Sequence, residues 1–117
     1  MEKEKISIIV PCYNEQEVLH ILFAELQKVT AQMSKYDFEL LFVNDGSKDK
    51  TLDILKELAK EDDRVVYMSF SRNFGKEAAM YAGFTNATGD YVVVMDADMQ
   101  DPPSLLPEMI TYIESGE

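Results

Sequence analysis

Four apolar runs, each of strand length and each followed by a stretch with helical spacing, restrict the fold of this chain more than any other feature. The runs are rich in β-branched residues, nearly continuous rather than alternating, and cover Ile6–Val10, Phe38–Val43, Val65–Phe70 and Tyr91–Met95. Continuous apolar runs are typical of parallel strands that are covered on both faces. A strand followed by a helix, repeated four times, predicts a doubly wound α/β fold with a parallel sheet and right-handed crossovers.

The segments between the runs carry apolar residues at intervals of three and four, as amphipathic helices do. This spacing is clear after the first and second runs and weaker after the third. A last helix is predicted over Leu105–Glu114, with Pro107 tolerated in its first turn. A chain of 117 residues has room for one such domain, which we expect to span residues 1–117.

Charge and cysteine content exclude several classes of partner. The chain has 22 acidic and 11 basic residues, a net charge of −11. Because nucleic-acid binding depends on Lys and Arg that neutralise phosphates, we expect no nucleic-acid partner. No run approaches the roughly 20 apolar residues of a membrane span, and the single cysteine, Cys12, cannot form an internal disulfide. We therefore expect a cytoplasmic protein.

The acidic segment after the fourth run is the first candidate for function, because doubly wound sheets bind ligands beyond the carboxyl ends of their strands. It contains Asp96, Asp98 and Asp101. Carboxylates this close raise one another's pKa, and a divalent cation such as Mg²⁺, which takes oxygen ligands, would relieve the conflict. Asp96 and Asp98 are therefore candidate metal ligands, with the amide oxygen of Gln100 beside them. The alternative interpretation is a solvated acidic turn.

The segments after the other three runs are also polar and offer groups that suit a nucleotide. Pro11 and Tyr13 are ordinary turn residues, but a Tyr ring at a sheet edge can also stack on a base. The carboxylate of Asp45 can accept the ring N–H of a base, although residues 45–47 also suit a simple strand-to-helix turn whose helix N-terminus could face an anion. Lys76, at a predicted helix start, could meet a phosphate oxygen.

Four segments together resemble the family 2 glycosyltransferases with the GT-A fold, in both order and spacing: IIVPCYNE, FVNDGSKDKT, RNFGKEAAMYAG and GDYVVVMDADMQDPP. The last segment is similar to the polyprenyl-phosphate branch, which includes dolichyl-phosphate mannose synthase. The resemblance covers nearly all of the chain. It implies a Rossmann-like sheet with strand order 3-2-1-4, and an inverting transfer of a sugar from a nucleoside diphosphate to a polyprenyl phosphate lipid. Such a transfer belongs to cell-wall or lipid-linked glycan biosynthesis.

The resemblance also implies roles for individual residues. Pro11, Tyr13 and Glu15 would line the base and ribose pocket, and Asp45 would bind the base ring. Metal ligands would come from Asp96, Asp98 and Gln100, which would hold Mg²⁺ or Mn²⁺ against the diphosphate of the donor. Asp96 would also bind the nucleotide, as would Lys76. The metal would stabilise the negative charge that grows on the leaving diphosphate.

Members of this family continue beyond the segments found here, with acceptor-side loops and often membrane-associated helices. We therefore expect this chain to be the N-terminal portion of a longer enzyme at the cytoplasmic face of a membrane, with its catalytic base elsewhere and no efficient transfer by the portion alone. The fourth strand would then lie at an edge of the sheet. Because an apolar edge can pair with another chain, we expect a homodimer through that strand. UDP and GDP donors, and the identity of the sugar, stay open.

Other classes of function fit the residues less well. A non-catalytic nucleotide- or metal-binding module is the first alternative, since binding requires only the segments described. A receiver-like signalling domain needs an acidic pair after the first strand, where Cys12 and Tyr13 stand, and an aspartate after the third, where Ser71 and Arg72 stand. A phosphatase-like fold places its Asp-x-Asp pair after the first strand rather than the fourth.

Overall fold

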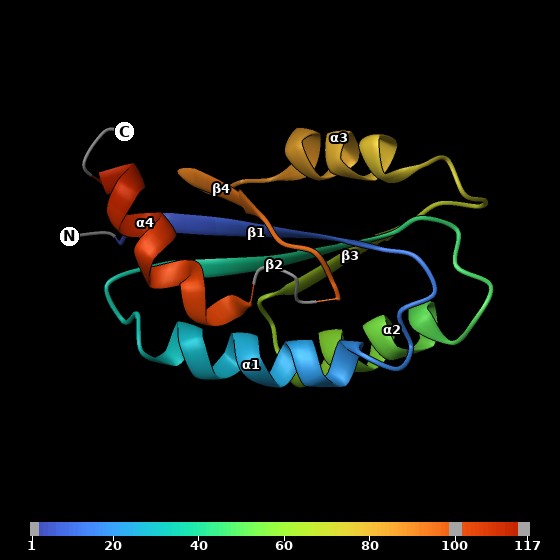
Figure 1. Ribbon diagram of the computed structural model, residues 1–117, viewed down its shortest axis with the longest axis horizontal. Helices are drawn as coiled ribbons and strands as arrows, with labels where there is room; N and C mark the ends of the chain where they lie inside the picture. Colours follow the sequence, from blue (N-terminus) through green and yellow to red (C-terminus); the bar gives the residue numbers. More distant parts are fainter. Residues whose placement is uncertain (1–2, 99–101, 115–117) are drawn as a thin grey trace.

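The computed structural model describes residues 3–98 and 102–114 and shows a parallel sheet with helices on both faces (Figure 1). Its strands are β1 (Lys5–Cys12), β2 (Asp37–Asn44), β3 (Val65–Ser69) and β4 (Tyr91–Val94). They lie in the order β3-β2-β1-β4, and every neighbouring pair is parallel. The predicted doubly wound sheet and its 3-2-1-4 order are confirmed.

The helices divide between the two faces of the sheet. Figure 1 shows α1 (Leu19–Ala31) and α2 (Thr51–Glu61) on one face and α3 (Lys76–Asn86) on the other. The predicted last helix is one turn of 3-10 helix, η1 (Pro103–Leu105), followed by α4 (Leu106–Glu114), so that Pro107 falls in the first turn of the α-helix, where its missing N–H is not needed. In the part of the chain that the structure describes, no helix is both long and apolar enough to cross a membrane.

Alternate side chains of the two central strands enter two separate cores, which explains why their sequences are nearly continuously apolar. Ile8 and Phe42 belong to the larger core, with residues of α1 and α2. Ile9 and Leu41 face the other way and pack with Ala79 of α3.

Small residues bring α3 close to the sheet. A Cβ atom added at Gly83 would lie 2.5 Å from Cγ2 of Ile9, so only glycine permits this approach. The close packing holds α3 over the sheet with its first residues toward the edge where the strands end (Figure 1).

Candidate functional site

The loops that follow β1 and β2 are joined by hydrogen bonds between side chains and backbone. The backbone N–H of Asn14 donates to Oγ of Ser47 over 2.9 Å, and Oδ1 of Asn14 accepts from the N–H of Lys48 over 2.8 Å. Similarly, Oε1 of Gln16 accepts from the N–H of Lys50 over 3.0 Å. The N–H groups of Lys48 and Lys50, just before α2, therefore already have side-chain acceptors. An anion at this helix N-terminus would have to displace those side-chain oxygens.

Asp45 connects the loop after β2 to the loop between β3 and α3. Its side chain is buried, with the residue 3% exposed. Oδ1 accepts from the N–H of Phe74 over 2.7 Å, and Oδ2 accepts from the N–H of Gly75 over 3.0 Å and from Nδ2 of Asn73 over 3.1 Å. A carboxylate has about four lone-pair positions, so one remains for a further donor. Asp45 thus fixes the approach to α3, a role that the sequence alone did not reveal.

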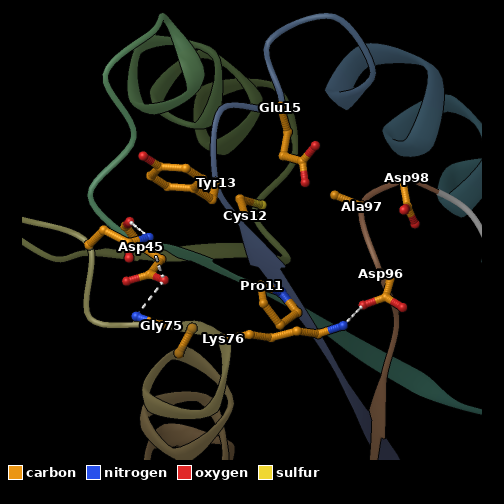
Figure 2. A pocket seen from close by; sticks show the side chains of 12 residues that line it. Pro11, Cys12, Tyr13, Glu15, Asp45, Gly75, Lys76, Asp96, Ala97 and Asp98 are labelled. Atoms are coloured by element: carbon orange, nitrogen blue, oxygen red, sulfur yellow. Dashed lines mark hydrogen bonds and ion pairs between the residues drawn. The ribbon is translucent and has the colours of Figure 1, made fainter.

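An ion pair joins α3 to the acidic segment after β4. The ammonium group of Lys76, the first residue of α3, donates to Oδ1 of Asp96. This hydrogen bond raises the pKa of Lys76. Asp98 follows on the same turn, and its side chain is exposed (Figure 2). The third predicted metal ligand, Gln100, lies outside the described residues.

Glu15 brings a third carboxylate to the same place from the loop after β1 (Figure 2). Its pKa is raised, first by burial and then by the negative charge of Asp98, with smaller effects from Asp49 and Asp96. Carboxylates from three different parts of the chain therefore act on one another electrostatically, and a cation among them would be stabilised.

These groups surround one cavity of about 430 Å³ at the carboxyl edge of the sheet (Figure 2). This volume lies within the range of small-molecule sites, roughly 300–1,000 Å³. All the predicted site residues that the structure describes line this cavity, namely Pro11, Tyr13, Glu15, Asp45, Lys76, Asp96 and Asp98. The sequence analysis missed the other lining residues, Cys12, Asn73, Gly75, Ala79 and Ala97.

Cys12 is the lining residue with nucleophilic chemistry of its own, but its surroundings suppress that chemistry. The residue is 1% exposed, and its thiol donates to the carbonyl oxygen of Val10 over 3.4 Å. Burial raises the pKa of the thiol, and the nearby charge of Glu15 adds to the effect. Since the thiolate is the reactive form, Cys12 is a packing residue of the cavity wall.

The oxygen donors of the cavity fit a divalent cation that is shared with a phosphate ligand. Among residues 3–98 and 102–114, no three His, Cys, Asp or Glu side chains form a ready-made metal site. Asp96 and Asp98 nevertheless provide hard oxygen donors at one side of the cavity. Mg²⁺ commonly takes only one or two carboxylates and completes its shell with phosphate oxygens and water.

Comparison with known proteins decides the family. The model of one family, Glycosyl transferase family 2, matches residues 7–117. The chain belongs to this family. The resemblance found in its four motifs is therefore confirmed.

Sequence relatives carry related names. The uncharacterized glycosyltransferase YkcC of Bacillus subtilis is 50% identical over 110 residues, which cover 94% of this chain and 34% of the relative. The bactoprenol glucosyl transferase of Shigella phage SfX is 43% identical over 112 residues, which cover 96% of this chain and 36% of the relative. The chain thus spans about one third of the length of the curated relatives that it matches.

Solved structures share the fold. Residues 1–349 of S. aureus TarS, crystallised with UDP-GlcNAc, are 25% identical to this chain with a TM-score of 0.73, over 95% of this chain and 31% of that one. The mannosyltransferase PcManGT from Pyrobaculum calidifontis, in complex with GDP-Man and Mn²⁺, is 22% identical with a TM-score of 0.80, over 96% of this chain and 33% of that one. Both are glycosyltransferases of the GT-A type, so the chain has a nucleotide-sugar-binding fold.

Proposed function

We propose that this chain is the donor-binding part of an inverting glycosyltransferase that transfers a sugar from a nucleoside diphosphate to a polyprenyl phosphate, with a divalent metal. The observation that carries the proposal is the gathering of Tyr13, Asp45, Lys76, Asp96 and Asp98 around one cavity. Structural neighbours bound to UDP-GlcNAc and GDP-Man support a nucleotide-sugar ligand. A relative named bactoprenol glucosyl transferase supports a lipid acceptor.

The side of the cavity formed by Tyr13 and Asp45 suits the nucleoside. Tyr13 lines the cavity and is 41% exposed as a residue, so its ring is available for stacking on a base. Asp45 has one acceptor position left for a ring N–H, and Pro11 also lines the cavity. Glu15 offers its carboxylate to the ribose hydroxyls.

The side formed by Lys76, Asp96 and Asp98 suits the diphosphate. Asp96 and Asp98, with Gln100, would hold Mg²⁺ or Mn²⁺ there, and the bound metal would stabilise negative charge on the leaving diphosphate. Lys76 is the one cation among the described residues that line the cavity, and it can meet a phosphate oxygen.

The acceptor side lies outside this chain in our proposal. A lipid phosphate is already ionised at neutral pH, so its attack on the sugar needs less help from a base than that of a hydroxyl group. We place the acceptor site and any catalytic base in the two thirds of the relatives' length that this chain does not span. The complete enzyme would then work at the cytoplasmic face of a membrane.

Thermal unfolding with UDP, GDP, UDP-GlcNAc and GDP-Man, each with and without Mn²⁺, tests the donor site. A nucleotide at 100 times its Kd stabilises the folded state by about 2.7 kcal/mol, which raises Tm by roughly 10 °C or more for a domain of this size. We expect Asp98→Ala to remove the Mn²⁺-dependent part of this shift. Asp63→Ala, which removes an exposed carboxylate from the turn before β3 and outside the cavity lining, is the control.

Two results would decide against the proposal. If none of the four nucleotides raised the Tm of the wild-type chain, the cavity would not be a donor site. If Asp98→Ala and Asp63→Ala gave the same Mn²⁺ dependence as the wild type, the metal would bind elsewhere. Transfer itself is tested on the full-length protein, with a radiolabelled nucleotide sugar and polyprenyl phosphate; binding without transfer would favour the non-catalytic module.

A further inference from the structure

We propose that Lys76 is an exchangeable counter-ion that links metal binding to nucleotide binding. In the free protein it neutralises Asp96, and when a divalent cation binds at Asp96 and Asp98 it moves to the diphosphate. This inference rests on the proposed function, because it assigns a mechanism of ligand coupling to the same cavity.

The position of Lys76 places its charge between two possible partners. Its backbone begins α3, which Asp45 holds in place through the N–H of Gly75. From there its side chain extends past Pro11 and reaches Asp96 at the end of β4 (Figure 2). The ammonium group therefore lies beside Asp96 in the cavity lining, and only the flexible part of the side chain has to move to meet a phosphate group in the cavity.

The ion pair is weak enough to exchange. The side chain of Lys76 is 58% exposed and that of Asp96 is 27% exposed. An exposed pair of this kind changes an equilibrium by a factor of about five at most, because water screens both charges and solvates them after separation. Displacement by a divalent cation is therefore readily achieved.

The charges of the cavity determine the direction of the exchange. A divalent cation on the two aspartates would stand close to the ammonium group of Lys76, and like charges so near repel each other. A diphosphate brings negative charge to the same place and offers Lys76 charge-assisted hydrogen bonds. Metal and nucleotide should thus bind cooperatively, and Lys76 should carry part of the coupling in both directions.

Calorimetric titration of the 117-residue chain tests this coupling. Mn²⁺ alone, UDP or GDP alone, and the nucleotide at saturating Mn²⁺ are titrated into the wild type and into Lys76→Met, which keeps the apolar stem but removes the charge. We expect the variant to bind Mn²⁺ alone roughly three- to tenfold more tightly, since a repelling charge is gone. Metal-free nucleotide should bind within about twofold of the wild type, because Lys76 is then held by Asp96. With Mn²⁺ the nucleotide should bind roughly tenfold more weakly, because a charge-assisted contact is lost.

Asp96→Asn supplies an independent arm of the test. This change releases Lys76 without any metal, so we expect metal-free nucleotide to bind several-fold more tightly than in the wild type. In the double variant Asp96→Asn and Lys76→Met, most of that gain should disappear if it acts through Lys76. Lys48→Met removes a lysine charge from a neighbouring loop outside the cavity lining and should leave the coupling unchanged.

Specific outcomes would overturn the inference. If Lys76→Met weakened nucleotide binding equally with and without Mn²⁺, Lys76 would be a permanent phosphate ligand and no exchange would take place. Unchanged affinities in all three titrations would make the ion pair a passive surface feature. If the wild type bound no nucleotide at all, the proposed function would fail together with the exchange, whereas intact binding with unchanged coupling would remove the exchange alone.

Discussion

Replacement of Gly46 by alanine should separate the loop after β2, which carries Asp45, from the loop between β3 and α3. Gly46 has φ +67°, and a Cβ atom there would lie 2.1 Å from the carbonyl carbon of Arg72 and 2.3 Å from the backbone N of Asn73. Both neighbours are backbone atoms, so no change of rotamer can relieve the contact. The loops have to move apart by roughly an ångström or more to reach ordinary van der Waals separation.

The expected loss of stability has two parts. A left-handed backbone costs an alanine about 1–2 kcal/mol relative to glycine. Moving the loops also stretches the hydrogen bonds that Asp45 accepts from the N–H groups of Phe74 and Gly75, and each bond to a charged group is worth about 1.5–3 kcal/mol. Loss of one such bond brings the total to about 3–5 kcal/mol, a large part of the stability of a domain of this size.

Urea unfolding followed by circular dichroism measures this loss, and Gly75→Ala is the matched control. Gly75 also has positive φ, +103°, but a Cβ atom added there meets nothing within 4 Å. Gly75→Ala should therefore lose only the free energy of backbone strain, about 1–3 kcal/mol, because its Cβ atom collides with no neighbouring atom. If Gly75→Ala destabilised the chain as much as Gly46→Ala, backbone conformation rather than loop contact would set the cost, and our reasoning would be refuted.

Three further predictions concern other parts of the structure. Glu39→Ala should lower the free energy of unfolding by about 2–4 kcal/mol, because the buried carboxylate of Glu39 accepts hydrogen bonds from the buried hydroxyl of Ser7 and from the N–H and hydroxyl of Thr88, while Glu39→Gln should lose less; chemical denaturation measures both. Hydrogen bonding from Arg64 lowers the pKa of Asp62 in the folded chain. The ionised Asp62 therefore stabilises the fold above pH about 4, and this stabilisation is lost as the pH falls further. The free energy of unfolding of the wild type should thus fall more steeply from pH 5 to pH 2 than that of Asp62→Asn. Strand β4 lies at the edge of the described sheet, and we expect self-association through it; light scattering that shows only monomers at millimolar concentration would contradict this.

The layered fold was predictable because its cause is local. Residues of opposite orientation, such as Ile8 and Ile9, are both apolar, and this alone indicates a strand buried on both faces. The strand order is different in kind. Nothing in the composition of β4 says that it pairs with β1 rather than β3, so the 3-2-1-4 order had to come from the resemblance to a family.

The cavity was only partly predictable, for a related reason. Carboxyl ends of parallel strands share one edge, so the grouping of Tyr13, Asp45 and Asp96 follows from topology. The bonds that Asp45 accepts from residues 28 to 30 positions later depend on the path of a loop, which no periodicity describes. Glycines at 46 and 75 were the available hint, since each has a conformation or a contact that disfavours other residues.

The two sides of the cavity are held by different kinds of interaction, and this difference bears on how a nucleotide sugar would bind. The nucleoside side is fixed by hydrogen bonds from backbone N–H groups. The N–H of Asn14 donates to Oγ of Ser47, and the N–H of Gly75 donates to Oδ2 of Asp45. Such a preformed surface can select a base without reorganisation, because its conformational entropy is already lost before binding. The diphosphate side depends on an exposed ion pair between side chains, which a ligand can rearrange at little cost. Base selectivity should therefore be insensitive to metal and salt, whereas affinity for the diphosphate should depend on both.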